Sequence, residues 1–85
     1  MKLRLVGSAL YKENPRDWDL ILVLPDDIFE RLYLTALDFE AQGVSGEWSP
    51  ARWRWANDSV AIGRMIAHLS GKNIDLKIVP ESMEH

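Results

Sequence analysis

Apolar and polar residues alternate along three segments of this chain, and each alternation predicts a β-strand. Residues 2–6 (K-L-R-L-V) alternate with period two, and so do residues 73–79 (N-I-D-L-K-I-V). Residues 17–24 (D-W-D-L-I-L-V-L) begin with alternation and then become continuously apolar. A continuously apolar strand is typical of the middle of a sheet that is covered on both faces. We therefore expect residues 17–24 to form a central strand.

Helical spacing of apolar residues separates the second strand from the third. Pro25-Asp26-Asp27 predicts a helix start, because proline fits the first turn and acidic residues suit the positive end of the helix dipole. This helix is expected to continue up to Gly43, a residue suited to a C-terminal cap. Asn57-Asp58-Ser59 predicts the N-cap of a second amphipathic helix, which is expected to end at Gly71.

The remaining segments complete the expected order of elements. Residues 44–56 are predicted to be a loop with room for a short strand at 52–55, and residues 9–16 can supply one helical turn. The fold class that follows is α+β, with a small mixed sheet packed against two main helices. A chain of 85 residues is too short for two independent cores, so residues 1–85 are expected to form a single domain.

Composition narrows the classes of protein that fit. An apolar content of 47% with 27% charged residues is typical of globular rather than disordered chains. There is no cysteine, which excludes disulfides and thiolate metal sites, and two histidines are too few for a histidine-based zinc site. No apolar run reaches the length of a membrane span and no signal-peptide pattern is seen, so a cytoplasmic protein without membrane association is expected. The net charge of −3 argues against binding nucleic acid by charge alone.

Two acids at the head of the central strand are the first candidate for chemistry. Asp17 and Asp19 are two residues apart, so both carboxylates are expected on one face of the strand. Two such charges about 4 Å apart repel by roughly 4 kcal/mol at an effective dielectric of ~20, and a cation, a base or protonation would relieve that repulsion. Mg²⁺ prefers hard oxygen ligands of this kind. The alternative is that one acid caps the strand while the other faces solvent, with Arg16 as its counter-charge.

Two further features can complete a site around this pair. Gly7-Ser8 directly follows the first strand, and a tight turn with free N–H groups and a hydroxyl suits phosphate, although such a pair is more often only a turn. Asp75 lies within the last apolar strand, and it can meet the same ions if that strand pairs beside residues 17–24. Three carboxylates can hold two divalent ions. The alternative for Asp75 is a solvent-facing acid that alternates with Lys77.

Taken together, a strand, Gly-Ser, an Asp-x-Asp strand and a later acid-bearing strand resemble the nucleotidyltransferase superfamily of the DNA polymerase beta type, and most of all its minimal members. The resemblance covers nearly the whole chain. It implies that Gly7 and Ser8 contact a nucleoside triphosphate, and that the catalytic residues Asp17, Asp19 and Asp75 bind two Mg²⁺ ions, with Mn²⁺ as a substitute. It further implies transfer of a nucleoside monophosphate to a hydroxyl acceptor.

A non-catalytic function stays open beside this one. Active members of the superfamily usually carry a further helical domain, and this sequence shows none. A pared-down nucleotidyltransferase can act as an interaction module instead, for example as the antitoxin-like partner of a helical protein, or it can form a homo-oligomer.

The segment rich in tryptophan and arginine supplies the last candidates. Arg52 and Arg54 are the nearest positive charges to an acidic site that must accept triphosphate, so we predict that they bind the nucleotide. Trp53 and Trp55 could stack on a nucleobase or on single-stranded nucleic acid. The favoured alternative is that both rings are buried against a small sheet.

Overall fold

A computed structural model describes residues 2–6 and 17–84, and its centre is a three-stranded mixed sheet. The strands are β1 (Lys2–Val6), β2 (Asp17–Leu24) and β3 (Asn73–Pro80). β2 is the middle strand, antiparallel to β1 and parallel to β3. The three predicted strands and the central position of residues 17–24 are therefore confirmed.

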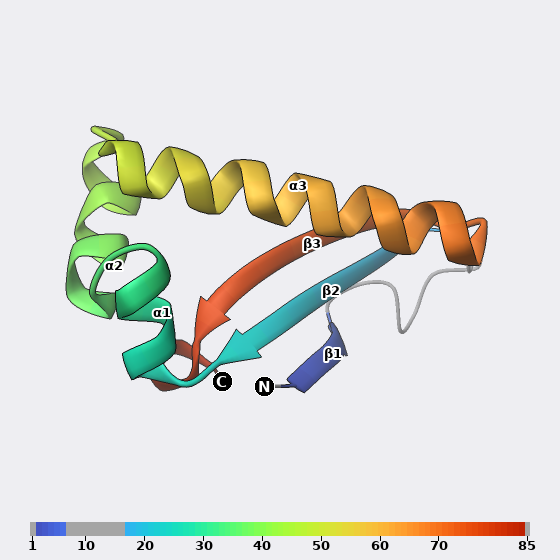
Figure 1. The fold of residues 1–85 in the computed structure, drawn as a ribbon, viewed down its shortest axis with the longest axis horizontal. Coiled ribbons are helices and arrows are strands. Elements are labelled where there is room, and N and C mark those ends of the chain that lie inside the picture. Colours follow the sequence, from blue (N-terminus) through green and yellow to red (C-terminus); the bar gives the residue numbers. More distant parts are fainter. Residues whose placement is uncertain (1, 7–16, 85) are drawn as a thin grey trace.

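Three helices connect the two parallel strands: α1 (Asp26–Leu32), α2 (Ala36–Ser45) and α3 (Pro50–Ser70). Parallel strands need such a crossover, because a tight hairpin can only join antiparallel ones. Figure 1 shows α1 and α2 at the end of the sheet where β2 and β3 finish, while α3 runs back along β3. The α+β class is confirmed. None of the helices in the described part of the chain is long and apolar enough to cross a membrane.

The single helix predicted up to Gly43 is wrong, because two helices occupy that segment. α1 ends at Leu32, and Leu34 turns into the core between the helices. Thr35 then caps α2, since its hydroxyl accepts a hydrogen bond from the backbone N–H of Asp38 at 3.1 Å. Satisfying that helix end makes a break stable at this point, so the expected two main helices become three.

The loop predicted over residues 44–56 and the strand at 52–55 are also wrong, because α3 begins at Pro50. Ser49 caps the helix by accepting a hydrogen bond from the Arg52 backbone N–H at 3.4 Å. Proline suits the first helical turn, where its missing N–H costs no intrahelical bond. The alternation of tryptophan and arginine therefore lies on a helix, where successive residues point about 100° apart, rather than on a strand.

The predicted N-cap Asn57-Asp58-Ser59 lies inside α3, and contacts within the fold make it compatible with a helix. The carboxylate of Asp58 accepts a hydrogen bond from the Tyr33 hydroxyl at 2.7 Å. The Ser59 hydroxyl donates to the carbonyl of Trp55, one turn earlier, at 2.8 Å. Asp58 and Ser59 therefore form hydrogen bonds with other groups instead of capping backbone N–H groups, so they do not start a new helix here.

α3 packs closely on β3 and completes the core. The Trp55 indole N–H donates to the Ile78 carbonyl at 2.7 Å, and at Gly63 an added Cβ would lie 3.4 Å from the Leu76 Cβ. The helix ends at Gly71, as predicted, with a φ of 72° that glycine adopts without strain. The buried apolar cluster comprises Leu20, Leu24, Phe29, Leu34, Phe39, Trp55, Leu76 and Ile78.

The C-terminal segment returns to the first strand. After a short 3₁₀ turn (Glu81–Met83), the carboxylate of Glu84 lies 2.8 Å from the Lys2 ammonium and 2.7 Å from the Arg4 guanidinium. Residues 2 and 84 are thus held together by charge, and β1 is tied to the end of the chain as well as to β2.

Candidate functional site

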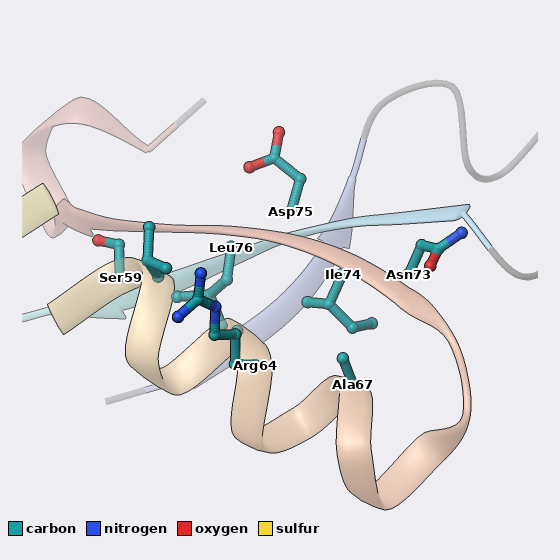
Figure 2. Close-up of a pocket in the computed structure, with 9 residues that line it drawn as sticks. Ser59, Arg64, Ala67, Asn73, Ile74, Asp75 and Leu76 are labelled. Carbon is teal, nitrogen blue, oxygen red and sulfur yellow. The ribbon is translucent and has the colours of Figure 1, made fainter. Parts of the chain in front are cut away.

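Two acidic residues from neighbouring strands lie side by side in the sheet. Asp19 of β2 is paired in register with Asp75 of β3, so the condition under which Asp75 could lie beside Asp19 is met. Neighbouring strands are about 4.8 Å apart and paired residues of a parallel sheet point to the same face, so both carboxylates project from one face. Figure 2 shows Asp75 pointing away from α3, whereas Ile74 and Leu76 point toward that helix.

An open pocket of about 220 Å³ lies beside this pair. Its lining residues come from the first three positions of β2 and β3, and they are Trp18, Asp19, Asn73, Ile74 and Asp75. The Lys72 ammonium lies 4.5 Å from the centroid of the Trp18 ring, just before β3 begins. The Trp18 ring attracts this cation, and because Trp18 is next to Asp19 and paired with Ile74, it lies on the face of the sheet opposite to the two carboxylates.

The described residues around the pair form no ion pair with it. Within residues 2–6 and 17–84, neither Asp19 nor Asp75 forms an ion pair. Carboxylates about 5 Å apart repel by about 1 kcal/mol in water and by about 3 kcal/mol at an effective dielectric of ~20. Carboxylate oxygens are the ligands that Mg²⁺ and Mn²⁺ prefer, so this donor set fits a hard divalent cation.

The remaining residues of the predicted phosphate and metal site cannot be compared with this geometry. Asp17 pairs through its backbone with Asn73, but its side chain lies outside the description, as do Gly7 and Ser8 entirely. Among the residues that are described, no three side chains of histidine, cysteine, aspartate or glutamate gather as metal ligands. The described part of the acidic site therefore consists of two carboxylates.

The structure does not bring Arg52 to these acids. Arg52 is buried at 6% exposure in the first turn of α3, and its guanidinium donates to the Phe39 carbonyl. It stacks at 4.1 Å, 4.8 Å and 5.0 Å from the ring centroids of Phe39, Trp48 and Trp55. Burial lowers the pKa of this guanidinium. Arg52 is thus a cation enclosed by aromatic rings, and it belongs to the core.

Arg54 also lies in the wrong half of α3 for the acidic pair. The N-terminal half of this helix packs near α1, where Arg54 acts electrostatically on Tyr33. Gly63, which contacts the start of β3, is nine residues further along, and a rise of 1.5 Å per residue separates the two by about 14 Å. Trp53 is exposed and Trp55 is buried, so the predicted burial holds for one of the two rings.

Arg64 is the basic residue that shares a groove with Asp75. It lines a groove of about 340 Å³ between α3 and β3, and Asp75 lines the same groove. The sequence contains a signal for this position, because α3 ends at Gly71 and β3 starts at Asn73. A helix rises less per residue than a strand, so a residue several positions before such a tight connection lies opposite one fewer positions after it. Arg64, seven residues before Gly71, and Asp75, four residues after it, satisfy that condition.

Comparison with known proteins adds no relative to this picture. No model of a protein family matches the chain, and neither a curated protein nor a solved structure matches it significantly.

Proposed function

We propose that this protein is a metal-dependent nucleotidyltransferase that moves a nucleoside monophosphate from a nucleoside triphosphate to a hydroxyl acceptor. The observation that carries the proposal is the register of Asp19 with Asp75. It sets two carboxylates on one face, beside an open pocket, at the starts of two parallel strands, and within residues 2–6 and 17–84 neither forms an ion pair. Asp17, which is two residues before Asp19 on the same strand, is proposed as the third acid.

The chemistry needs both binding and proton removal. Mg²⁺ held by the acids would neutralise charge on the triphosphate and on the leaving pyrophosphate. Asp75 lies where the acceptor hydroxyl would approach and is proposed to accept its proton. The acceptor oxygen then forms a bond to the α-phosphorus, and the bond from that phosphorus to the bridging α–β oxygen breaks. Gly7 and Ser8 are the proposed contacts for the β- and γ-phosphates.

Metal binding is the first experiment, because it needs no knowledge of the acceptor. Mn²⁺ would be titrated into the full chain and followed by electron paramagnetic resonance of the free ion, for the wild type and for Asp19→Asn and Asp75→Asn. Glu40→Gln, which removes an exposed acid from α2, is the matched control. We expect each aspartate variant to weaken binding by at least tenfold and the control to change it little. Equal binding by all four proteins would refute the proposed site.

Turnover is tested separately from binding. Incubation with each nucleoside triphosphate and Mg²⁺, followed by detection of released pyrophosphate, shows whether transfer occurs. A protein that binds Mn²⁺ through Asp19 and Asp75 but releases no pyrophosphate with any of a panel of hydroxyl acceptors would be a metal and nucleotide binder rather than an enzyme.

A second candidate function is supported by the apolar surface. Leu37 and Val44 on α2 and Leu69 on α3 are each about four-fifths exposed or more. Leu37 and Val44 are seven residues apart and therefore lie on one face of α2, and an exposed apolar face of this kind is a feature of protein-binding surfaces. This favours an interaction module with a helical partner, and a stoichiometric complex that survives loss of Asp19 and Asp75 would distinguish it from the enzyme.

A further inference from the structure

The groove between α3 and β3 is larger than the pocket beside the acidic pair and opens next to it. Its volume of about 340 Å³ reaches the lower end of the range found for small-molecule sites. One wall is the flank of α3, with Ser59, Val60, Gly63, Arg64 and Ala67, and the other is the start of β3 from Asn73 to Leu76. Asn73, Ile74 and Asp75 line both hollows, so the groove and the pocket meet at the start of β3.

Small residues line the α3 wall of this groove. Gly63 lets the helix lie close against β3, since an added Cβ there would lie 3.4 Å from the Leu76 Cβ and 3.7 Å from the Ile74 carbonyl oxygen. One turn further along, Ala67 offers only a methyl group. A larger residue in place of Ala67 would extend into the groove that Ala67 lines.

The two charged residues that line the groove place their side chains on different sides of β3. Arg64 is the only cationic residue among the described lining residues, and Figure 2 shows its side chain rising from α3 toward β3. The Asp75 carboxylate points away from α3, on the other side of the strand. Val60 and Ile74 contribute apolar side chains to the lining. A guanidinium suits phosphate or carboxylate, because its planar fork can donate two parallel hydrogen bonds.

We propose that this groove binds the acceptor, and that the acceptor is a small hydroxyl compound carrying one oxyanion group, a phosphate or a carboxylate. Arg64 holds the oxyanion, and repulsion by Asp75 directs that end of the molecule away from the acidic pair. Because β3 is an edge strand, the hydroxyl end passes its edge where the groove and the pocket meet and reaches Asp75 on the other face, where the transfer takes place. The assignment as acceptor rests on the proposed nucleotidyl transfer, whereas anion binding by Arg64 does not depend on it.

Anion binding is tested without metal or nucleotide. Glycerol 3-phosphate, glycerate and glycerol would each be titrated into ¹⁵N-labelled full-length protein and followed by amide chemical shifts. We expect saturable shifts at Gly63, Ala67 and Asn73 with at least one of the two anions and none with glycerol. The stronger anion then identifies the group as phosphate or carboxylate. Binding of uncharged glycerol as tightly as either anion would overturn the proposal.

Two variants probe the groove and one serves as control. Arg64→Gln should weaken anion binding by at least about tenfold, because a charge-assisted contact is lost. Ala67→Leu retains the charge but fills the space, and it should abolish the shifts. Arg54→Gln removes an exposed arginine from the same helix outside the groove and should leave affinity within about twofold. Anion affinity that is unchanged in both Arg64→Gln and Ala67→Leu would overturn the site.

The outcome for the acceptor role is separated by Mn²⁺ binding to the same variants. Arg64→Gln should retain Mn²⁺ affinity, since no metal ligand is changed, whereas Asp75→Asn should lose it. If the wild type binds the anion through Arg64 but does not bind Mn²⁺, the proposed transfer and the acceptor role fail while the anion site stands. If Mn²⁺ binds and the anion does not, the groove proposal alone fails.

Discussion

Replacing Asp75 by asparagine should stabilise the protein in the absence of divalent metal. Asp75 is exposed, Asp19 is half-buried, and their strands are paired residue for residue. With the carboxylates about 5 Å apart, Coulomb repulsion lies between about 1 kcal/mol in water and about 3 kcal/mol at an effective dielectric of ~20. Because both groups reach solvent, we expect a gain near the lower value, about 1 kcal/mol in the free energy of unfolding.

The expected size is well within the range of a denaturation experiment. For a domain of this length, about 1 kcal/mol corresponds to a rise of roughly 4–8 °C in Tm. Urea unfolding followed by tryptophan fluorescence would measure the same change as a shift in midpoint. Glu40→Gln is again the control, because it removes one negative charge from α2 and not from a paired site. The gain for Asp75→Asn should exceed that of the control at low salt and shrink in 1 M NaCl, where the screening length falls to about 3 Å.

Addition of Mg²⁺ should reverse the order of stability. A ligand that binds only the folded state at one hundred times its Kd adds about 2.7 kcal/mol. The wild type should gain that amount and overtake Asp75→Asn, which should gain little. NaCl of matched ionic strength separates specific binding from screening. The reasoning is refuted if Asp75→Asn is destabilised without metal, or if Mg²⁺ stabilises the two proteins equally.

Three further perturbations test other parts of the structure. Arg52→Met should leave the free energy of unfolding unchanged or raise it by about 1 kcal/mol, because it removes a buried charge whose Nε has no hydrogen-bond partner among the described residues. Arg52→Ala should instead lower it by about 2–4 kcal/mol through the cavity it leaves, and urea unfolding distinguishes the two variants. Burial and the hydrogen bond to Asp58 raise the pKa of Tyr33, so the stability that this tyrosine contributes is complete below its unfolded pKa near 10 and is lost as the pH rises above that value. Tyr33→Phe should therefore lower the free energy of unfolding by about 1 kcal/mol at pH 7 and flatten its loss at alkaline pH, which unfolding measured from pH 7 to 11 would show. Hydrogen bonds from Lys2 and then Arg4 lower the pKa of Glu84, so the stability that this carboxylate contributes is present above its unfolded pKa near 4.3 and is lost as the pH falls through the lower folded pKa. Glu84→Gln should make the free energy of unfolding less sensitive to pH between these two values. An unchanged acid profile would contradict the ion pair.

The strands could be predicted because their signals are local. Alternation over residues 2–6 and 73–79 and the apolar run after Asp19 are properties of contiguous residues, and each forms a strand where expected. The central position of β2 was inferred from its continuous apolar run. What the pattern could not supply was the register with β3, which depends on how three intervening helices return the chain. That register decides whether Asp75 lies beside Asp19 or one residue away from it, on the opposite face.

The start of α3 was misjudged because two local signals compete there. Ser49-Pro50 is a valid helix start, but the alternation that follows also fits a strand, and Asn57-Asp58-Ser59 fits a later N-cap. The choice is made by tertiary contacts. Asp58 accepts from a tyrosine of the segment after α1, and Trp55 donates to the carbonyl of Ile78 in β3. These partners are distant in sequence, so no window of residues could reveal them.

The same contacts divide α3 into two parts with different roles. Its first turns carry Arg52 and Trp55, which join α2 and β3 into the aromatic core. Its later turns carry Gly63 and Arg64, which line the groove that Asp75 also lines. Prediction from sequence assigned the nucleotide to Arg52 and Arg54 because they were expected to be the nearest positive charges to the acidic site. A helix of this length separates the two groups by more than the reach of an arginine side chain, so core and site can change independently. Substitutions at Arg52 should therefore alter unfolding without altering Mn²⁺ affinity, and substitutions at Arg64 should alter anion binding without altering unfolding by more than about 0.5 kcal/mol.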